Sequence, residues 1–244
     1  MIINAAAYTA VDRAESEPEL AFKINRDAPA GISEESEFCG ALFVHYSTDY
    51  VFDGAQSTPY TESDLANPLS VYGQSKLAGE QAIQTSRGAY LILRTSWVYG
   101  LRRTSFVKKV LSWARSHYEL KVVTDQVSGP TWCRDLAEAT AQLLAMGGQQ
   151  PAAWLGERRG LYHLASTGTA SRFEWAQAIL ELDPNPHEQL ARTLEPAVSQ
   201  DFPTPARRPY YSALDCSRFY KAFGLRLPHW RTSLQLAMDK ERLA

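Results

Sequence analysis

Short apolar runs alternate with helix-forming segments along the first half of the chain, and this alternation constrains the fold more than any other feature. The apolar runs have the length of buried strands and lie at 1–7, 41–47, 89–94 and 120–123. The helical patterns between them cover about 18–38, 69–86 and 105–117. Strands that alternate with helices predict a parallel α/β sheet covered by helices. Within the first helix, Pro29 and Gly31 predict a break or a kink.

The second half departs from this alternation after Pro130. Its helical patterns and its one short strand lie near 134–146, 172–181, 216–222 and 232–243, and at 161–164. The stretch 149–160 is expected to be a loop, and 183–209 holds six prolines and has little periodicity. We therefore expect a larger domain over residues 1–129 and a smaller lobe over residues 130–244, interleaved with the first domain.

The bulk composition is that of a globular protein, because 45% of the 244 residues are hydrophobic and 21% are charged. A net charge of −2 provides no broad basic surface, so no nucleic-acid partner is expected. No apolar run has the length of a membrane span and no signal peptide is recognisable, so no membrane partner is expected either. The three separated cysteines are typical of reduced thiols and favour a cytoplasmic location. The histidines do not cluster at ligand spacing, so no zinc site is expected.

Tyr72 and Lys76 stand four residues apart in a predicted helix, so both side chains lie on one face. An ammonium near a phenol favours the phenolate and lowers the phenol's pKa from its ordinary value near 10. The pair is therefore typical of a proton donor to a carbonyl group that accepts a hydride. The same spacing also arises by chance on ordinary helices, so the two residues alone do not decide the chemistry.

Polar and aromatic residues follow the predicted strands and so lie at the carboxyl edge of the sheet, where open α/β sheets bind ligands. Ser47-Thr48-Asp49 follows the second strand and can hydrogen-bond a substrate oxygen, although an ordinary turn uses the same residue types. The small side chains of 4–9 allow a flat ligand to approach the backbone, and tight packing explains them equally well. Trp97 follows the third strand and can stack on a sugar or a base, or lie in an interface or in the core.

The glycines and the arginines bear on phosphate binding. Arg207 and Arg208 stand together in a proline-rich turn, and paired guanidiniums bind phosphate well, while a solvated turn is the alternative. No two glycines stand two or three positions apart, as the turn of a dinucleotide-binding site requires. The residues thus predict the proton-transfer half of a nicotinamide-dependent short-chain reductase without its phosphate-binding turn.

Six segments together resemble the dTDP-4-dehydrorhamnose reductases, a family of extended short-chain reductases. They occur in the family's order and lie at 4–12, 45–52, 71–80, 94–99, 160–164 and 203–209. The resemblance covers nearly the whole chain. It implies an N-terminally truncated Rossmann-like parallel sheet, which would be the dinucleotide-binding domain over 1–129, and a smaller C-terminal substrate-binding lobe over 130–244.

The resemblance also implies an activity, the reduction of dTDP-4-dehydro-L-rhamnose to dTDP-L-rhamnose by hydride from NADPH or NADH, in polysaccharide biosynthesis. Tyr72 would protonate the forming oxyanion, and Lys76 would hold the nicotinamide ribose. Thr48 would bond the reacting oxygen, with Asp49 beside it, and Trp97 would pack on the sugar. The other residues implied to line the cofactor are Ala7, Tyr8, Thr9 and Tyr46. A homodimer, with Mg²⁺ at the dimer contact in some members, is also implied.

The sequence departs from the family pattern in two places. One is the amino end, and the other is 31–36, where the family tends to have an apolar helix face. In the family, on the order of 50 residues, more than one βαβ unit, precede the strand that starts this chain. We expect the adenine half of the cofactor to lack its cradle and the sheet to have an exposed apolar edge. Three interpretations stay open: a reductase of this keto sugar, a reductase of another nucleotide-linked 4-keto sugar, and a non-catalytic or regulatory relative or inactive fragment.

Overall fold

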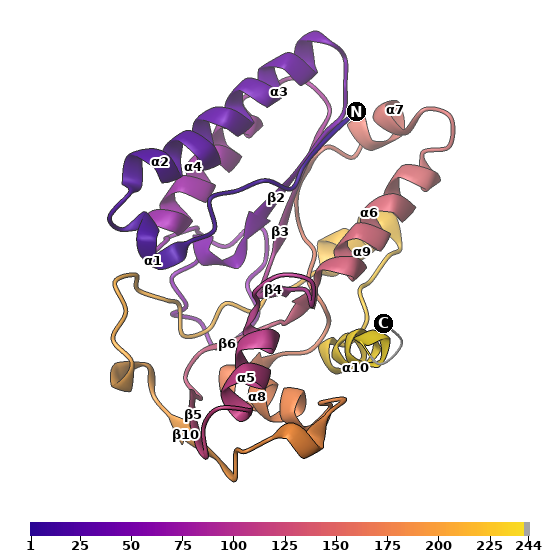
Figure 1. Cartoon of the computed structure of the whole chain (residues 1–244). Coiled ribbons are helices and arrows are strands. Elements are labelled where there is room, and N and C mark those ends of the chain that lie inside the picture. The colour runs from indigo at the N-terminus through magenta and orange to yellow at the C-terminus, as the bar shows by residue number, and fades with distance from the viewer. Residues whose placement is uncertain (242–244) are drawn as a thin grey trace.

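A four-stranded parallel sheet forms the upper part of the molecule in the computed structural model, which describes residues 1–241 and the side chains up to Asp239 (Figure 1). The strands follow the spatial order β1-β2-β3-β8, and each neighbouring pair is parallel. Their bounds are Ile2–Asn4 for β1, Phe43–Thr48 for β2, Tyr90–Thr95 for β3 and Gly160–His163 for β8. The predicted parallel α/β sheet is therefore confirmed.

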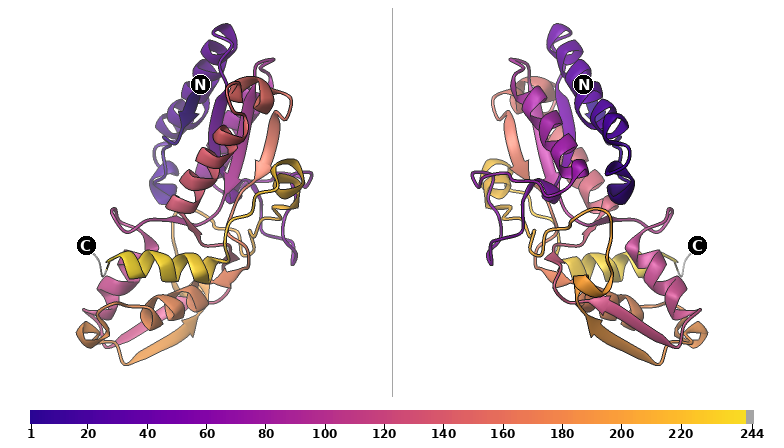
Figure 2. Two further views of the ribbon diagram at one scale, coloured as in Figure 1. Left: turned by 90° about the vertical axis from the view of Figure 1, so that its right-hand side faces the viewer. Right: turned by 90° about the vertical axis from the view of Figure 1, so that its left-hand side faces the viewer.

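Helices cover both faces of this sheet, as Figures 1 and 2 show. Successive strand residues point to opposite faces, so Phe43 packs with Ile83 of helix α4, whereas Val44 packs with Leu136 of helix α6. One face carries α3 (Ala28–Phe38) and α4 (Val71–Gln84). The other carries α6 (Cys133–Met146), α7 (Pro151–Gly156) and α9 (Ser217–Phe223). Helix α7 corrects the expectation of a loop at 149–160; it is only six residues long and begins at a proline.

The first predicted helix is interrupted before its proline. It consists of α2 (Pro18–Phe22), a π-helical turn (Lys23–Asp27) and α3, after the short helix α1 (Val11–Ala14). The Ala28 N–H donates to Lys23 O, five residues back instead of four, so the ladder is widened just ahead of Pro29. The break predicted from Pro29 and Gly31 thus takes the form of a π turn.

Strand β1 lies at the edge of the sheet, pairing only with β2. The sequence predicted a buried strand over 1–7, but β1 spans three residues, and Ile2 and Ile3 are 37% and 43% exposed. The apolar run was misleading because β1 is an edge strand, where these two side chains stay partly exposed. The expected exposed apolar edge is therefore present.

A second layer lies below the sheet and is built around two short parallel strands (Figure 1). Strand β5 (Glu119–Val123) pairs with β10 (Thr193–Ala197), and neither belongs to the main sheet. The placement of 120–123 in the main sheet was therefore wrong, and the stretch 183–209, despite its little periodicity, contains β10. Helices α5 (Phe106–Ala114), α8 (Arg172–Glu181) and α10 (Trp230–Glu241) pack beside these strands.

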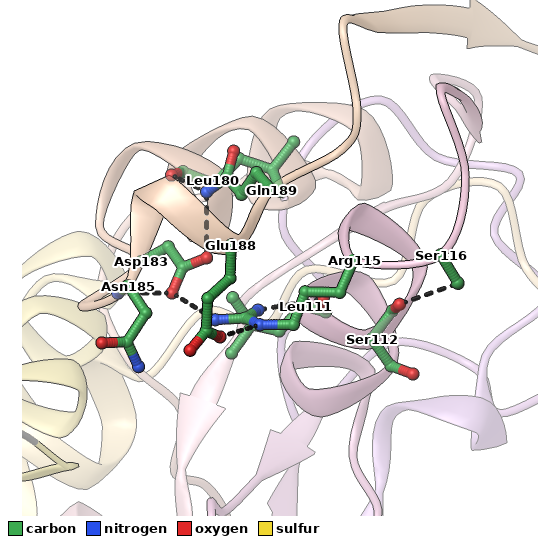
Figure 3. Close-up of polar contacts among 9 residues, drawn as sticks. All are labelled: Leu111, Ser112, Arg115, Ser116, Leu180, Asp183, Asn185, Glu188 and Gln189. Carbon is green, nitrogen blue, oxygen red and sulfur yellow. Dashed lines mark hydrogen bonds and ion pairs between the residues drawn. The ribbon is translucent and has the colours of Figure 1, made fainter.

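Arg115, just after α5, ties this helix to the segment that follows α8 (Figure 3). Its guanidinium donates to Asp183 Oδ1 at 3.0 Å and to Glu188 Oε2 at 2.6 Å. Asp183 also accepts from the Gln189 amide at 2.9 Å and from the Asn185 N–H at 3.0 Å. Because the Asp183 side chain is fully buried, this cluster fixes how the chain leaves α8 and enters β10.

The chain passes between the main sheet and the second layer more than once. Two small two-stranded ladders join the layers, and they pair β4 (Val98–Tyr99) with β7 (Thr131–Trp132) and β6 (Val127–Ser128) with β9 (Ala170–Ser171). After β7 the chain returns to the sheet through α6 and β8. A division of the chain at residue 129 stays a prediction. None of the helices within residues 1–241 has the length and apolar character needed to cross a membrane.

Candidate active site

Thr48 and Asp49 lie where β2 ends, at the carboxyl edge of the sheet. The Thr48 hydroxyl accepts from the Tyr50 N–H at 3.2 Å and caps a 3₁₀ turn over Asp49–Val51. Asp49 is 2% exposed, and its carboxylate accepts from the hydroxyls of Ser212 at 2.5 Å and Ser128 at 3.2 Å. Asp49 therefore joins the sheet edge to strand β6 and to the segment that contains Ser212.

Two effects compete for the proton of Asp49. Hydroxyl donors favour the carboxylate, whereas burial in a medium of low dielectric constant favours the neutral acid. Burial is the larger effect and raises the pKa of Asp49 to about 6, against the opposing hydrogen bonds of Ser212, Ser128 and Thr48. Asp49 is thus a carboxyl group that changes charge close to neutral pH.

Tyr72 lies in the first turn of α4, which docks tightly on the turn after β2. The Ser70 hydroxyl caps this helix by accepting from the Gly73 N–H at 3.2 Å. A Cβ at Gly73 would lie 2.3 Å from Tyr50 O, so only glycine permits this approach. The Tyr72 ring meets the Tyr50 ring edge-on, with centroids 5.9 Å apart. Burial raises the pKa of Tyr72, while a hydrogen bond with Thr48 opposes the rise.

Lys76 turns toward β2 rather than toward Tyr72. It is 2% exposed, and its Nζ donates to Tyr46 O at 2.7 Å and lies 3.1 Å from His45 Nε2. Burial lowers the pKa of Lys76 to about 8, and the charge of Glu80 opposes the change. The sequence predicted that Lys76 lowers the pKa of Tyr72; instead that pKa is raised, because burial dominates and the groups that shift it are Thr48, Asp49 and Tyr50.

The predicted cofactor segment Ala7-Tyr8-Thr9 forms an open loop after β1 that Asn25 holds in place. The Asn25 amide accepts from the Tyr8 N–H at 2.9 Å and donates to Tyr8 O at 3.1 Å and to Ser75 Oγ at 3.0 Å. The Tyr8 hydroxyl donates to Glu17 at 2.5 Å. The loop is thereby fixed against α4, the helix that carries Tyr72 and Lys76.

Tyr46 and Trp97 lie away from this loop. The Tyr46 hydroxyl lies 2.5 Å from Thr140 Oγ1 on α6, on the other face of the sheet from α4. Trp97 is 9% exposed and adopts a φ of +42°, in the left-handed region that is unusual for a bulky residue. The Arg172 guanidinium lies 3.6 Å above the Trp97 ring, and Trp175 stacks on that ring at 5.6 Å.

A cavity of about 1290 Å³ opens beside this cluster, between α5, β5 and the segment 199–210. Its lining is rich in cations, which are Lys109, Lys121, Arg172, Arg207 and Arg208. Tyr72 and Thr48 do not line it, but Arg172 and Arg208 both lie beside Tyr50, which contacts Tyr72. Arg208 is held by Asp12 at 2.7 Å. The arginine pair noted in the sequence thus lines this cavity, and Arg208 is linked to Tyr72 through Tyr50.

Comparison with known proteins identifies the family. The profile of the RmlD substrate binding domain matches residues 1–243. The dTDP-4-dehydrorhamnose reductase of Escherichia coli K12 is 40% identical over 241 residues, covering 98% of this chain and 79% of that protein. This chain belongs to the dTDP-4-dehydrorhamnose reductase family. The resemblance found in the sequence is therefore confirmed.

Solved structures of this family agree. The dTDP-4-dehydrorhamnose reductase of Clostridium acetobutylicum has a TM-score of 0.88 at 35% identity, covering 98% of this chain and 80% of that one. The Bacillus anthracis enzyme, solved in complex with NADP, has a TM-score of 0.86 at 34% identity with the same coverage of both chains. The chain thus has the reductase fold over nearly its whole length.

Several residues of this reductase site were missed in the sequence. Asn25 and His45 contact the predicted segments from within a helix and an apolar strand, and Arg172 is far from Trp97 along the chain. His45 could have been noticed as a polar residue within the apolar run 41–47, because a buried histidine needs hydrogen-bond partners. Among the residues whose side chains are described, no group of three or more histidine, cysteine or acidic side chains could hold a metal ion, so the Mg²⁺ expectation gains no support.

Proposed function

We propose that this chain reduces dTDP-4-dehydro-L-rhamnose to dTDP-L-rhamnose with a nicotinamide cofactor as the hydride source. The observation that carries the proposal is the hydrogen bond between Tyr72, which is half-buried, and Thr48 at the carboxyl end of β2. A carbonyl oxygen placed between these two hydroxyls gains negative charge when hydride adds to its carbon. Two donors at that point stabilise the developing charge.

The raised pKa of Tyr72 supports its role as the acid. A phenol that stays protonated at neutral pH always has its proton available, and the sugar alkoxide formed by hydride addition is a much stronger base than a phenolate. The O–H bond of Tyr72 breaks as the O–H bond of the product alcohol forms. Thr48 orients the substrate oxygen and donates no net proton.

The residues of the sheet edge fit the nicotinamide end of the cofactor. The alanines at positions 5–7 directly follow Asn4, the last residue of β1, which pairs in register with His45 of β2. They therefore lie near β2, whose His45 contacts the Lys76 side chain. Small side chains leave the backbone accessible to a flat ring, and Lys76 can donate to ribose hydroxyls. The bound cofactor would supply the hydride. The cofactor of this proposal is NADPH or NADH, and Ala7, Tyr8 and Thr9 are the residues proposed to contact it.

The cation-lined cavity fits the diphosphate of a nucleotide sugar. The guanidinium of Arg172 lines the cavity while it covers Trp97, and it lies beside Tyr50 within reach of the charge of Asp49. A planar guanidinium is suited to bidentate phosphate binding. The sugar would then extend from Arg172 toward Tyr50 and Tyr72.

The test is an assay of the purified chain with the keto sugar and NADPH or NADH. Tyr72→Phe removes only the proton donor, so kcat is expected to fall about 10²- to 10⁴-fold. The control is Tyr220→Phe, because Tyr220 is 42% exposed on α9 and is not among the residues that line the cavity. Turnover that is unchanged in Tyr72→Phe contradicts the proposal. If the cofactor is oxidised only with another nucleotide-linked 4-keto sugar, the substrate is a different one. If the chain binds a partner protein and shows no turnover, a regulatory role is favoured.

A further inference from the structure

Arg172 lies between the Trp97 ring and the cation-lined cavity. Its guanidinium lies 3.6 Å from the centre of that ring and lines the cavity, whereas Trp97 is 9% exposed and is not among the lining residues. We infer that Arg172 is a gate, which covers Trp97 until the diphosphate of a nucleotide sugar draws the guanidinium away, so that only a nucleotide-linked sugar can pack on Trp97. The inference rests on the proposed function and adds a specificity-determining residue to it.

Of the two residues in this contact, Arg172 is the one that can move. Trp97 has a φ of +42°, and such strained backbone is typical of ligand sites and switch regions. Its carbonyl accepts from the Thr131 N–H at 3.3 Å, which ties Trp97 to β7. Arg172 has a long side chain with several rotatable bonds and is half-buried. A change in the cover of Trp97 therefore requires only that the Arg172 side chain turn.

The contacts that hold the guanidinium on Trp97 are of a kind that a phosphate can replace. The rings of Phe106 and Trp175 lie at 4.9 Å and 5.4 Å from it, further than Trp97, so the main contact is with the Trp97 ring. A cation–π contact at a partly exposed site is weaker than a bidentate, charge-assisted hydrogen bond to phosphate. A phosphate that enters the cavity thus offers Arg172 a stronger partner.

The charge of Arg208 gives this movement a direction. Arg172 and Arg208 both hydrogen-bond Tyr50 and both line the cavity, so two like charges converge there. Asp12 pairs with Arg208 at 2.7 Å and offsets part of their repulsion. A diphosphate between the two guanidiniums would offset the rest. Because the Tyr50 ring contacts the Tyr72 ring, a diphosphate bound at this point holds the attached sugar close to the proton donor.

The test follows the exposure of Trp97 by ¹⁹F NMR of protein labelled with 5-fluorotryptophan. A signal of this kind differs between H₂O and D₂O when the ring meets solvent, and the Trp97 signal is assigned by its loss in Trp97→Phe. The probes are thymidine diphosphate, which carries no sugar beyond its own nucleoside, and thymidine, which lacks the diphosphate. Trp154 is the internal control, because Arg158 lies 4.4 Å from its ring centre and neither residue lines the cavity.

We expect thymidine diphosphate to increase the H₂O–D₂O difference of the Trp97 signal and to leave that of Trp154 unchanged, and thymidine to change neither. In Arg172→Ala, Trp97 should be exposed without any ligand. Arg172→Met keeps a long side chain but has no charge, so Trp97 should stay covered even when the diphosphate is bound. Loss of the guanidinium should also weaken the binding of thymidine diphosphate about 10- to 100-fold, measured by calorimetry.

The inference is overturned if thymidine diphosphate binds the unsubstituted protein and Trp97 stays covered, whether or not the variants fold. That result would mean that Arg172 binds phosphate while it still lies on the ring. Turnover of the keto sugar is measured separately, so the gate can fail while the proposed reaction stands. If thymidine diphosphate does not bind at all, both the gate and the proposed diphosphate site are wrong.

Discussion

Asp49→Asn tests which of two opposing effects controls the buried carboxyl group at the sheet edge. The carboxylate of Asp49 accepts hydroxyl hydrogen bonds, which stabilise its charge, and is buried, which destabilises it. Burial raises its pKa from 3.8 to about 6, so the folded protein binds this proton more tightly than the unfolded chain does. Asparagine has the shape of the neutral acid and cannot ionise.

The raised pKa sets both the sign and the size of the effect. The stability that Asp49 contributes is fully present below pH 3.8 and is lost as the pH rises through about 6. At about 1.4 kcal/mol for each pKa unit, the stability lost through Asp49 between low and high pH amounts to about 3 kcal/mol. About 2.5 kcal/mol of this loss occurs between about pH 4 and pH 8. Asp49→Asn should therefore gain about 2.5 kcal/mol relative to the unsubstituted protein over that range.

The measurement is urea denaturation of both proteins at the two pH values, because the difference between them cancels the titration of all other groups. Asp53→Asn is the matched control with the opposite sign. The pKa of Asp53 is lowered by the Ala55 N–H and by the Asn67 amide, so this variant should lose stability as the pH rises. If the stability difference for Asp49→Asn were constant with pH, or fell toward pH 8, the hydroxyl bonds would outweigh burial and the reasoning would be refuted.

Two further stability predictions follow from close contacts around α4. Arg94→Met leaves the Glu80 carboxylate, which is 1% exposed, without its paired guanidinium and should lower the free energy of unfolding by about 3–5 kcal/mol in urea denaturation. The control is Arg134→Met, which breaks an exposed ion pair and should lower it by about 0.3–0.5 kcal/mol. Equal losses of stability in the two variants would contradict this prediction. Gly79→Ala would place a Cβ 2.1 Å from a backbone carbonyl and should cost about 1–3 kcal/mol. Gly31→Ala meets nothing within 4 Å and should gain about 0.5–1 kcal/mol by thermal denaturation, so a gain at both glycines would be the opposing result.

The sequence predicted those parts of the fold in which local pattern and tertiary environment agree. The runs that became β2 and β3 are apolar because both faces of the sheet are covered. Strand β10 was missed because it is short, lies in a two-stranded ladder and contains Pro196, which is unfavourable in a central strand. Its formation depends on β5, about 70 residues earlier, and no local pattern encodes that pairing.

The same distinction applies to the site. Thr48 and Tyr72 could be predicted, because one follows a strand and the other starts a helix, and both positions meet at one sheet edge. The direction of the Lys76 side chain and the cover that Arg172 places on Trp97 could not, because they depend on contacts across the fold. The pKa of Tyr72 was predicted in the wrong direction, because burial has no local sequence signal.

The central claim is that this chain transfers a hydride to C4 of a nucleotide-linked keto sugar while Tyr72 supplies the proton. Its most direct test is a single-turnover reaction of the purified chain with dTDP-4-dehydro-L-rhamnose and nicotinamide cofactor carrying deuterium at the transferred position. The account predicts dTDP-L-rhamnose with deuterium at C4 of the sugar by NMR, and strongly reduced formation of that product in Tyr72→Phe. No product, deuterium at another carbon, or equal product from Tyr72→Phe would contradict the account.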